Sequence, residues 1–368
     1  MTNTALSQAT LADVEALRLL LAGSSVIDWQ RLSFADLSEV DRFLKLHEFD
    51  VQKPEVLARL EALREDAVEY LTRSLGYRIP AEVAHEMPVR ELFLLASSRG
   101  RRQAYACIVL KAMHVMHHLA GRELLFVLPV SDDEVFALVE RKVVDTVEQI
   151  RAAGYPIVEF AWSRKEHDSI VTKLLAKRQS IAANVFDKLR FRLVTRSLND
   201  LPAVLNELLH RLVPFNYVIP GESVNGILPF RRMVESIPSF ARWADKLQKD
   251  DAAEGQEHLS LQNEFSGPGY RIINFVVDMP VRFGEDLGAV QTTGELDKGH
   301  VIFVLTEFQV MDAETAKRNE EGENSHFAYK QRQYIRVKAR LEGGLKPDEP
   351  TGPVALPDDP DYVDADDD

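Results

Sequence analysis

The first third of the chain has the hydrophobic spacing of helices. Residues 55–75 show it best, and residues 11–21 and 34–47 follow the same pattern. Apolar side chains that recur every three or four positions form one buried face of a helix. In residues 55–75 these side chains are Leu57, Leu60, Leu63, Ala67 and Leu71. Because strand signals are almost absent before residue 123, we predict an all-helical N-terminal region over residues 1–125.

After residue 123 the pattern alternates between helices and strands, and an apolar run at 124–128 opens this part of the chain. We expect helices at 132–153, 165–179 and 201–212, and strands at 157–162, 189–195, 270–283 and 300–310. Such alternation predicts an α+β (α/β-type) domain over residues 126–345, in which helices flank a mixed sheet.

The C-terminal segment, residues 346–368, differs from everything before it. Between Pro347 and Asp368 there are nine acidic residues, five prolines and no Lys or Arg. Of the net charge of −14, residues 1–346 therefore carry only −5. A segment with so little apolar surface cannot repay the entropy of ordering, and we predict disorder. Its role is either a solubilising extension or an acidic mimic that covers a basic site of the same chain.

Composition limits the classes of protein that remain. No run of about 18 apolar residues exists to span a membrane, and the N-terminus lacks the cationic and apolar parts of a signal peptide. The single cysteine, Cys107, excludes an internal disulfide and is expected to be buried. The negative net charge disfavours DNA as a partner. We therefore expect a cytoplasmic protein without a membrane or DNA partner.

Three histidines, His114, His117 and His118, lie on neighbouring positions of one predicted helix. The segment before them, residues 106–111, adds no carboxylate to that face within a turn. We interpret them as polar helix positions or hydrogen-bonded core histidines rather than as metal ligands.

A row of polar residues recurs every four positions in the next helix. The row consists of Lys165, Ser169, Lys173 and Lys177, and Arg164 and Arg178 flank it. Two interpretations are open: an exposed basic helix, or a row that binds phosphates through ammonium groups and a hydroxyl.

The strand that follows favours phosphate binding. Residues 188–194 alternate between basic and apolar side chains, and Asp187 stands at the entrance of the strand. A second carboxylate, Glu307, lies in the apolar strand 300–310, where an ionised side chain needs a cation, a metal or an open cleft. Two carboxylates beside a basic row are the parts of a site for Mg²⁺ and nucleotide phosphates. The alternative is that Asp187 caps the strand and Glu307 pairs with Arg190 or Arg192.

Four segments occur in order over residues 130–335. They are Ser163-Arg164-Lys165 through Ser169-Ile170 to Lys173; Asp187 with Arg192 and Val194; Gly269-Tyr270; and Glu307-Phe308-Gln309-Val310, followed without a gap by Glu320, Gly322 and His326-Phe327-Ala328-Tyr329-Lys330. These segments resemble motifs of the synthetase domain of the RelA/SpoT family, the alarmone (guanosine tetra- and pentaphosphate) synthetases of the stringent response.

The resemblance implies a nucleotidyltransferase-like sheet and Mg²⁺-dependent transfer of pyrophosphate from ATP to the ribose 3′-hydroxyl of GDP or GTP. Asp187 would hold the metal, Glu307 would help to hold it or act as the base toward the hydroxyl, and Tyr270 would stack on the guanine. The group around the ATP phosphates would be Arg164, Lys165, Ser169, Lys173, Lys177 and Arg192. Further positions of the family motif are Gln309, Glu320, Gly322 and His326.

The chain also departs from the family pattern. The leading Arg of the basic segment is Ser163, although Arg164 could replace it if the chain shifts by one residue. The Lys before Gly-Tyr is Ser266, the His after it is Asn274, and the Arg and Thr that end the last motif are Met311 and Asp312. Residues 221–265 form an insert ahead of Gly269-Tyr270.

Three hypotheses for function follow. The first is an alarmone-like pyrophosphotransferase that depends on Asp187 and Glu307. The second is a related nucleotidyl- or pyrophosphotransferase that uses another acceptor, such as a different nucleotide or an RNA 3′ end. The third is a noncatalytic nucleotide sensor or interaction protein. In each, the N-terminal helices are available to bind a protein partner or a second copy of the chain.

Overall fold

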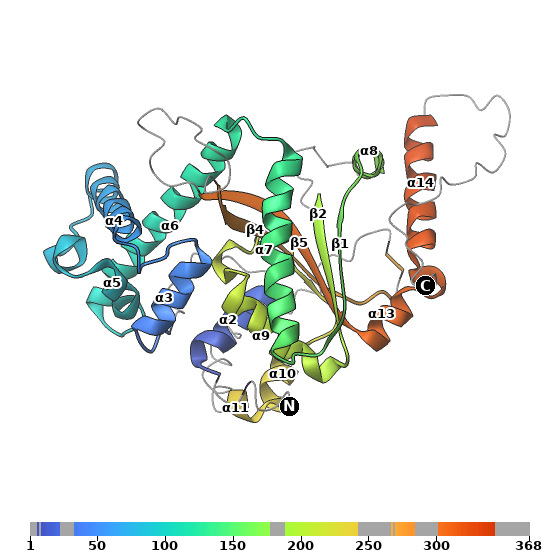
Figure 1. Cartoon of the computed structure of the whole chain (residues 1–368), viewed down its shortest axis with the longest axis horizontal. Helices are drawn as coiled ribbons and strands as arrows, with labels where there is room; N and C mark the ends of the chain where they lie inside the picture. Colours follow the sequence, from blue (N-terminus) through green and yellow to red (C-terminus); the bar gives the residue numbers. More distant parts are fainter. Residues whose placement is uncertain are drawn as a thin grey trace.

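The computed structural model of the chain describes residues 6, 9–22, 33–176, 188–241, 266–267, 269–283 and 301–342. Within these residues five strands form one sheet in the order β1–β2–β5–β4–β3. The strands are β1 Ile157–Arg164, β2 Leu189–Thr195, β3 Val224–Asn225, β4 Ile273–Arg282 and β5 Val301–Asp312. β2 and β5 run parallel and all other neighbours run antiparallel, so the sheet is mixed, as predicted (Figure 1).

Helices surround this sheet and make up the described part of the N-terminal region, which confirms the α+β class. They are α2 Leu11–Ala22, α3 Leu37–Leu46, α4 Pro54–Leu75, α5 Val89–Ala96, α6 Arg101–Val127, α7 Asp132–Ala152, α8 His167–Ala176, α9 Leu201–Arg211, α10 Phe230–Ser236, α11 Pro238–Ala241, α13 Ala313–Asn319 and α14 His326–Glu342. α7 begins where a capping box between Ser131 and Glu134 satisfies two backbone N–H groups of its first turn.

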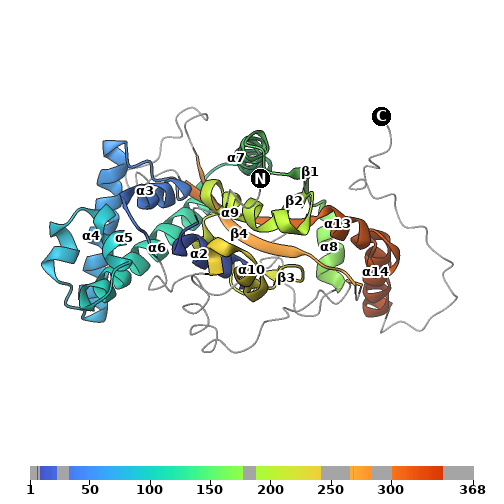
Figure 2. The same cartoon turned by 90° about the horizontal axis from the view of Figure 1, so that it is seen from below.

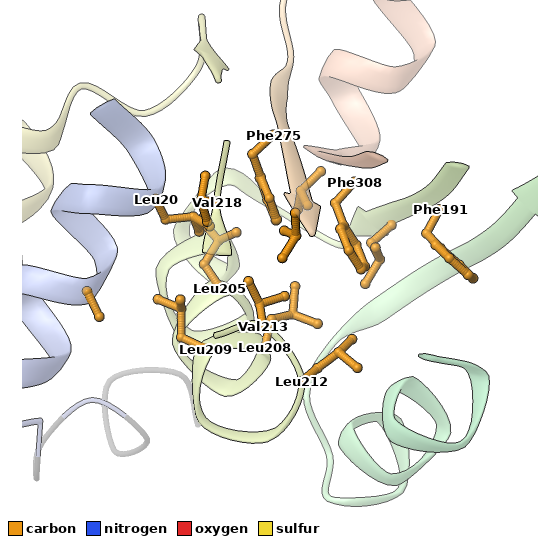
Figure 3. Close-up of a cluster of buried hydrophobic side chains, with 14 of the residues drawn as sticks. Leu20, Phe191, Leu205, Leu208, Leu209, Leu212, Val213, Val218, Phe275 and Phe308 are labelled. Carbon is orange, nitrogen blue, oxygen red and sulfur yellow. The ribbon is translucent and has the colours of Figure 1, made fainter. Parts of the chain in front are cut away.

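One face of the sheet is the centre of the main hydrophobic core. Phe191, Phe308 and Phe275 from β2, β5 and β4 stack in a row, with centroid distances of 5.5 and 5.3 Å. The leucines of α9 point at these rings (Figure 3), and α7 adds a stripe of valines over the same core. Each side chain of this size that leaves water stabilises the fold by about 2 kcal/mol.

The N-terminal helices have a second core, which α6 joins to the sheet. Buried side chains of α3 to α6 form this cluster, among them Phe43, Leu92 and Leu110. Further along α6, Gly121 lies against β5, where a Cβ atom would come within 2.5 Å of the Phe303 ring. Only glycine lets the helix approach the strand so closely. The expected boundary at residue 125 therefore lies inside α6, and the apolar run 124–128 ends this helix instead of opening the sheet domain.

The other face of the sheet carries polar side chains between buried apolar ones, and the polar ones are partly exposed. Cross-strand register brings Arg190 opposite Glu307, and Arg192 opposite Gln309. Asn274 also lies opposite Gln309, and Asp278 lies four residues further along β4, opposite Leu305. Since side chains alternate along a strand, all of these residues share one face. We call this set the polar face; its members are Arg190, Arg192, Asn274, Asp278, Glu307 and Gln309.

The expected insert 221–265 is described as far as residue 241. Val224 and Asn225 form β3, which pairs with β4 at the edge of the sheet, so this part of the insert extends the sheet. The rest of the insert and the acidic segment 346–368 lie outside the described residues. Among the helices that the structure describes, each is too short or too polar to cross a bilayer.

Candidate functional site

Glu307 is buried on the polar face and has an arginine partner. Its side chain is 9% exposed, and Nε of Arg190 donates to its Oε2 at 2.8 Å. The amide of Gln309 lies 3.4 Å from Oε1. This pair accounts for the charge of Glu307 inside the sheet without a metal. It is the ion pair with Arg190 that the sequence left open as the alternative for Glu307.

Arg192 lies beside this pair and connects three parts of the chain. Its guanidinium lies 3.1 Å from Glu159 on β1 and 2.8 Å from Glu320, which directly follows α13. Glu320 was expected as a motif position, and the structure shows it holding Arg192. Gly322, in the same segment, has a φ of 58°, a left-handed conformation that glycine adopts without strain.

Tyr270 lies close to the charges of the polar face. It packs against the apolar cluster formed by Val194, Ile272, Met311 and Ala316. Burial raises the pKa of its hydroxyl, and the nearby charges of Arg190 and Glu307 act on it in opposite directions. This half-buried ring is thus placed beside the Arg190–Glu307 pair.

The turn that carries Tyr270 packs on the Gly322–Asn324 segment. The N–H of Gly269 donates to Oδ1 of Asn324 at 3.2 Å. A Cβ atom at Gly267 would come within 2.3 Å of the same Asn324 oxygen. Two of the motif segments, distant in sequence, therefore meet here, and a glycine makes the contact possible.

Arg164 lies on the opposite side of the sheet. It pairs with Leu189 across the β1–β2 ladder, and Leu189 belongs to the main core. Its guanidinium holds both oxygens of Glu140 on α7, at 2.6 and 2.7 Å, and also contacts Asp133. The residue that faces Arg190 is Ser163. A shift of one residue in a strand reverses the face, so Arg164 does not replace the missing motif arginine on the polar face.

The basic row is partly described. The N–H of Lys165 donates to the Lys188 carbonyl, which extends the β1–β2 pairing by one step, and α8 starts two residues later. On α8, the Ser169 hydroxyl lies 3.2 Å from Nζ of Lys330 on α14, so two motif segments meet again. Lys173 is half-buried on the same helix. Lys177 and Asp187 lie outside the described residues, as does the side chain of His326.

The polar face offers few side chains that could hold a metal ion. In the described ranges no group of three His, Cys, Asp or Glu side chains could hold a metal ion. Mg²⁺, however, often takes only one or two protein carboxylates and completes its shell with substrate phosphates and water. Glu307 is such a carboxylate on a partly exposed face, and Asp187 is the second candidate. Among the described residues of this face, the Glu307 carboxylate has donor chemistry that would fit Mg²⁺.

Two of the three histidines of α6, His114 and His118, are hydrogen-bonded, as predicted, whereas Nε2 of His117 is buried without a partner among the described residues. Nδ1 of His114 lies 3.1 Å from the amide nitrogen of Asn216, and Nε2 of His47, which directly follows α3, lies 2.8 Å from the amide oxygen of the same side chain. Burial lowers the pKa of His47 to about 4 and those of His114 and His117 to about 3, so all three are neutral at pH 7. They join the helical region to the sheet.

Two features of the polar face escaped the sequence analysis. Oδ1 of Asn274 is buried and has no hydrogen-bond partner among the described residues, although Asn274 was noted only as a departure from the family. Asp278 is bonded by His118 and Arg122 from α6, far away in sequence. Alternation along the strand could have indicated that Asn274 and Asp278 lie on the same face of β4, because they are an even number of residues apart.

Comparison with known proteins gives distant similarities only. No family model matches the chain, and no curated protein matches it. Small alarmone synthetase 2 from Bacillus subtilis is 16% identical, with 56% of this chain and 90% of that chain covered at a TM-score of 0.30. Small alarmone synthetase 1 from the same organism, bound to its product pppGpp, is 18% identical, with 56% and 86% covered at a TM-score of 0.30.

A GTP pyrophosphokinase family protein from Streptococcus pneumoniae is 14% identical, with 57% of this chain and 83% of that chain covered at a TM-score of 0.28. At these TM-scores the likeness alone does not establish a function. The chain is similar, at a distance, to these alarmone synthetases and to this GTP pyrophosphokinase family protein.

Proposed function

We propose that this protein transfers the pyrophosphoryl group of ATP to the ribose 3′-hydroxyl of a guanosine nucleotide, GDP or GTP. The observation that supports it is the polar face, where a buried carboxylate is held by an arginine beside a second arginine and a half-buried tyrosine. A carboxylate, cationic donors and a stacking ring on one face are the groups that a phosphoryl-type transfer to a nucleoside needs. The resemblance of the motifs points to the same reaction.

Glu307 is the proposed base of this reaction. The acceptor 3′-oxygen attacks the β-phosphorus of ATP, the bond from that phosphorus to the oxygen bridging to the α-phosphorus breaks, and AMP leaves. The hydroxyl proton passes to a carboxylate oxygen of Glu307. Arg190 then neutralises negative charge that gathers on the transferred group.

The donor phosphates are proposed to lie at the end of β1 and on α8. Lys165 follows β1, Ser169 and Lys173 belong to α8, and Lys330 joins them through its contact with Ser169. Ammonium groups act there as point charges on phosphate oxygens. Tyr270 is proposed to stack on the acceptor base. Arg164, by contrast, anchors β1 to α7.

Magnesium is proposed as the cofactor, held by Glu307 and Asp187 together with substrate phosphates. When bound, it would neutralise the phosphate oxygens and orient the β-phosphorus for attack.

A second candidate function keeps the chemistry and changes the acceptor. The buried, unpartnered Oδ1 of Asn274 offers an acceptor to an N–H or O–H group of a ligand. Met311 is buried in an apolar cluster, and Asp312 caps the start of α13, so neither presents the cationic or hydroxyl group of the family motif. These differences favour an acceptor other than GDP or GTP, which is either a different nucleotide or an RNA 3′ end.

The test is a transfer assay with ATP labelled on its terminal phosphates, Mg²⁺ and a panel of acceptors that includes GDP, GTP, ADP, ATP and an RNA oligonucleotide. We expect labelled product with GDP or GTP, and a loss of about 100-fold or more in kcat for Glu307→Gln. The control is Glu314→Gln, an exposed position on α13 that should leave kcat unchanged. Full activity of Glu307→Gln would refute the role of Glu307. Transfer only to ADP, ATP or RNA supports the second candidate, and no transfer to any acceptor supports a noncatalytic nucleotide sensor.

A further inference from the structure

Helix α6 carries two side chains onto one end of the polar face. Nε2 of His118 lies 2.6 Å from Oδ2 of Asp278, and NH1 of Arg122 lies 3.4 Å from Oδ1 of the same carboxylate. Arg122 also lies 3.4 Å from the Phe303 carbonyl. Asp278 is 3% exposed, whereas His118 and Arg122 are 33% and 31% exposed. The cluster thus has a buried anion below and two cationic or potentially cationic groups toward solvent.

Arg122 and His118 have nitrogen atoms that no described residue bonds. A guanidinium has five N–H donors, and the contacts described for Arg122 use only NH1, at long distances. The His118 ring uses Nε2 toward Asp278, and no described residue bonds its Nδ1. When both ring nitrogens are protonated, Nδ1–H becomes a donor. The charged groups that face His118 are Asp278 and Arg122, while the neutral rings of His114 and Tyr217 pack beside it.

The position of this cluster follows from the register of the sheet. Asp278 lies opposite Leu305, and Glu307 lies opposite Val276, so the two carboxylates occupy adjacent rows of the same face. Two residues of a strand span about 7 Å. Tyr270 packs on the other side of the Glu307 row, against Ile272 and Met311. Figure 1 shows the same order, with α6 at one end of the β4–β5 pair and α13 at the other.

Tyr270, Glu307 and the His118–Arg122 pair therefore follow one another along the polar face. A nucleotide has the same order of parts: base, ribose and 5′-phosphates. We propose that His118 and Arg122 bind the 5′-phosphates of the acceptor nucleotide, with its ribose beside Glu307 and its base beside Tyr270. This proposal rests on the proposed function for the identity of the ligand.

The assignment gives the N-terminal helices a part in the site. The departures at Ser266 and Met311 remove cationic groups that the family motif provides. Arg122 and His118 add cationic or potentially cationic groups to the same face from helix α6, and Asp278 fixes their orientation. An arginine that contacts a phosphate through two N–H groups binds it more firmly than one contact does.

The test measures binding without turnover, by titrating the full chain with GDP and, separately, with a nonhydrolysable ATP analogue. Arg122→Gln should raise the Kd for GDP by about 10-fold to 100-fold, because a hydrogen bond to a charged group is lost, and should leave the Kd for the ATP analogue unchanged. Arg122→Lys should recover part of the affinity. The matched control is Arg102→Gln on the same helix, 67% exposed, which should change neither Kd.

His118 is tested in the same way with His118→Gln, which removes the imidazole that lies on Asp278. This variant should raise the Kd for GDP by about 10-fold and leave the Kd for the ATP analogue unchanged. An unchanged Kd for GDP would overturn the role of His118.

The remaining outcomes are distinct. The proposal is overturned by an unchanged Kd for GDP in Arg122→Gln, by equal losses for GDP and the ATP analogue, or by no GDP binding at all. Inorganic pyrophosphate that binds as tightly as GDP, and through Arg122, would show a site for free polyphosphate and overturn the acceptor assignment. GDP binding that depends on Arg122 in a protein that transfers nothing would leave this site standing and refute the proposed reaction.

Discussion

Acidification should destabilise this protein through its buried histidines. In the folded chain, burial lowers the pKa of His47 to about 4 and of His117 to about 3. In the unfolded chain the pKa of each histidine is about 6.5. Between about pH 6.5 and pH 4 the unfolded state therefore binds more protons than the folded state, and the free energy of unfolding decreases as the pH falls.

The magnitude can be worked out for one side chain. A histidine with a pKa of 6.5 unfolded and about 4 folded contributes about 2 kcal/mol less stability at pH 5 than at pH 7. His114, with a folded pKa of about 3, adds a similar loss. The three sites interact, so about 6 kcal/mol is an upper limit for their sum. The pKa of the Asp13 carboxyl is lowered in the folded chain, so this group changes the free energy of unfolding at a lower pH than the histidines do.

The assay is urea unfolding followed by circular dichroism at pH 7, 6 and 5. The test variant is His117→Phe, because the His117 ring packs on Phe49 and Phe303 and its Nε2 has no described partner. This variant should lose about 2 kcal/mol less than the wild type between pH 7 and pH 5. The control is His85→Gln at an exposed position, which should retain the wild-type dependence. A wild-type free energy of unfolding that is equal at pH 7 and pH 5 would refute the reasoning.

Three further predictions concern stability and the site. Arg190→Met should cost about 3 kcal/mol in urea unfolding because it leaves the Glu307 carboxylate buried and unpaired, and the double variant with Glu307→Leu should recover most of that loss; a single variant as stable as wild type would contradict the pair. Gly121→Ala should cost about 1 to 3 kcal/mol, since its methyl group meets the Phe303 ring, and an unchanged melting temperature would contradict that contact. Arg164→Met should lower stability by about 1 kcal/mol and leave the KM for ATP unchanged; a raised KM would return Arg164 to the phosphate site.

Local patterns predicted most elements of the sheet domain. The alternation of basic and apolar side chains over residues 188–193 marks β2, and Ser131 with Glu134 marks the start of α7. Both signals depend on near neighbours in sequence, so they can be read without the fold. The apolar run 124–128 has no such marker, because a short buried run suits a strand or the end of a helix equally.

The candidate site was less accessible to sequence, because it depends on register. Arg164 and Ser163 differ by one position, and only the pairing of β1 with β2 decides which of them faces Arg190. Likewise, two arginines of β2, Arg190 and Arg192, are candidate ion-pair partners of Glu307. The parallel register of β2 with β5 places Arg190 opposite Glu307. Pairing of distant strands is set by the whole sheet, and no local pattern reports it.

The same reasoning explains why the N-terminal helices looked separate from the site. Their own core, around Phe43 and Leu92, suggests an independent unit. Yet α6 continues from that core to the sheet, where Gly121 removes the side chain that would keep the helix away from β5. That close approach is what places His118 and Arg122 over Asp278. A glycine whose function cannot be read from its neighbours in sequence thus determines whether the helical region lies beside the sheet or takes part in the site.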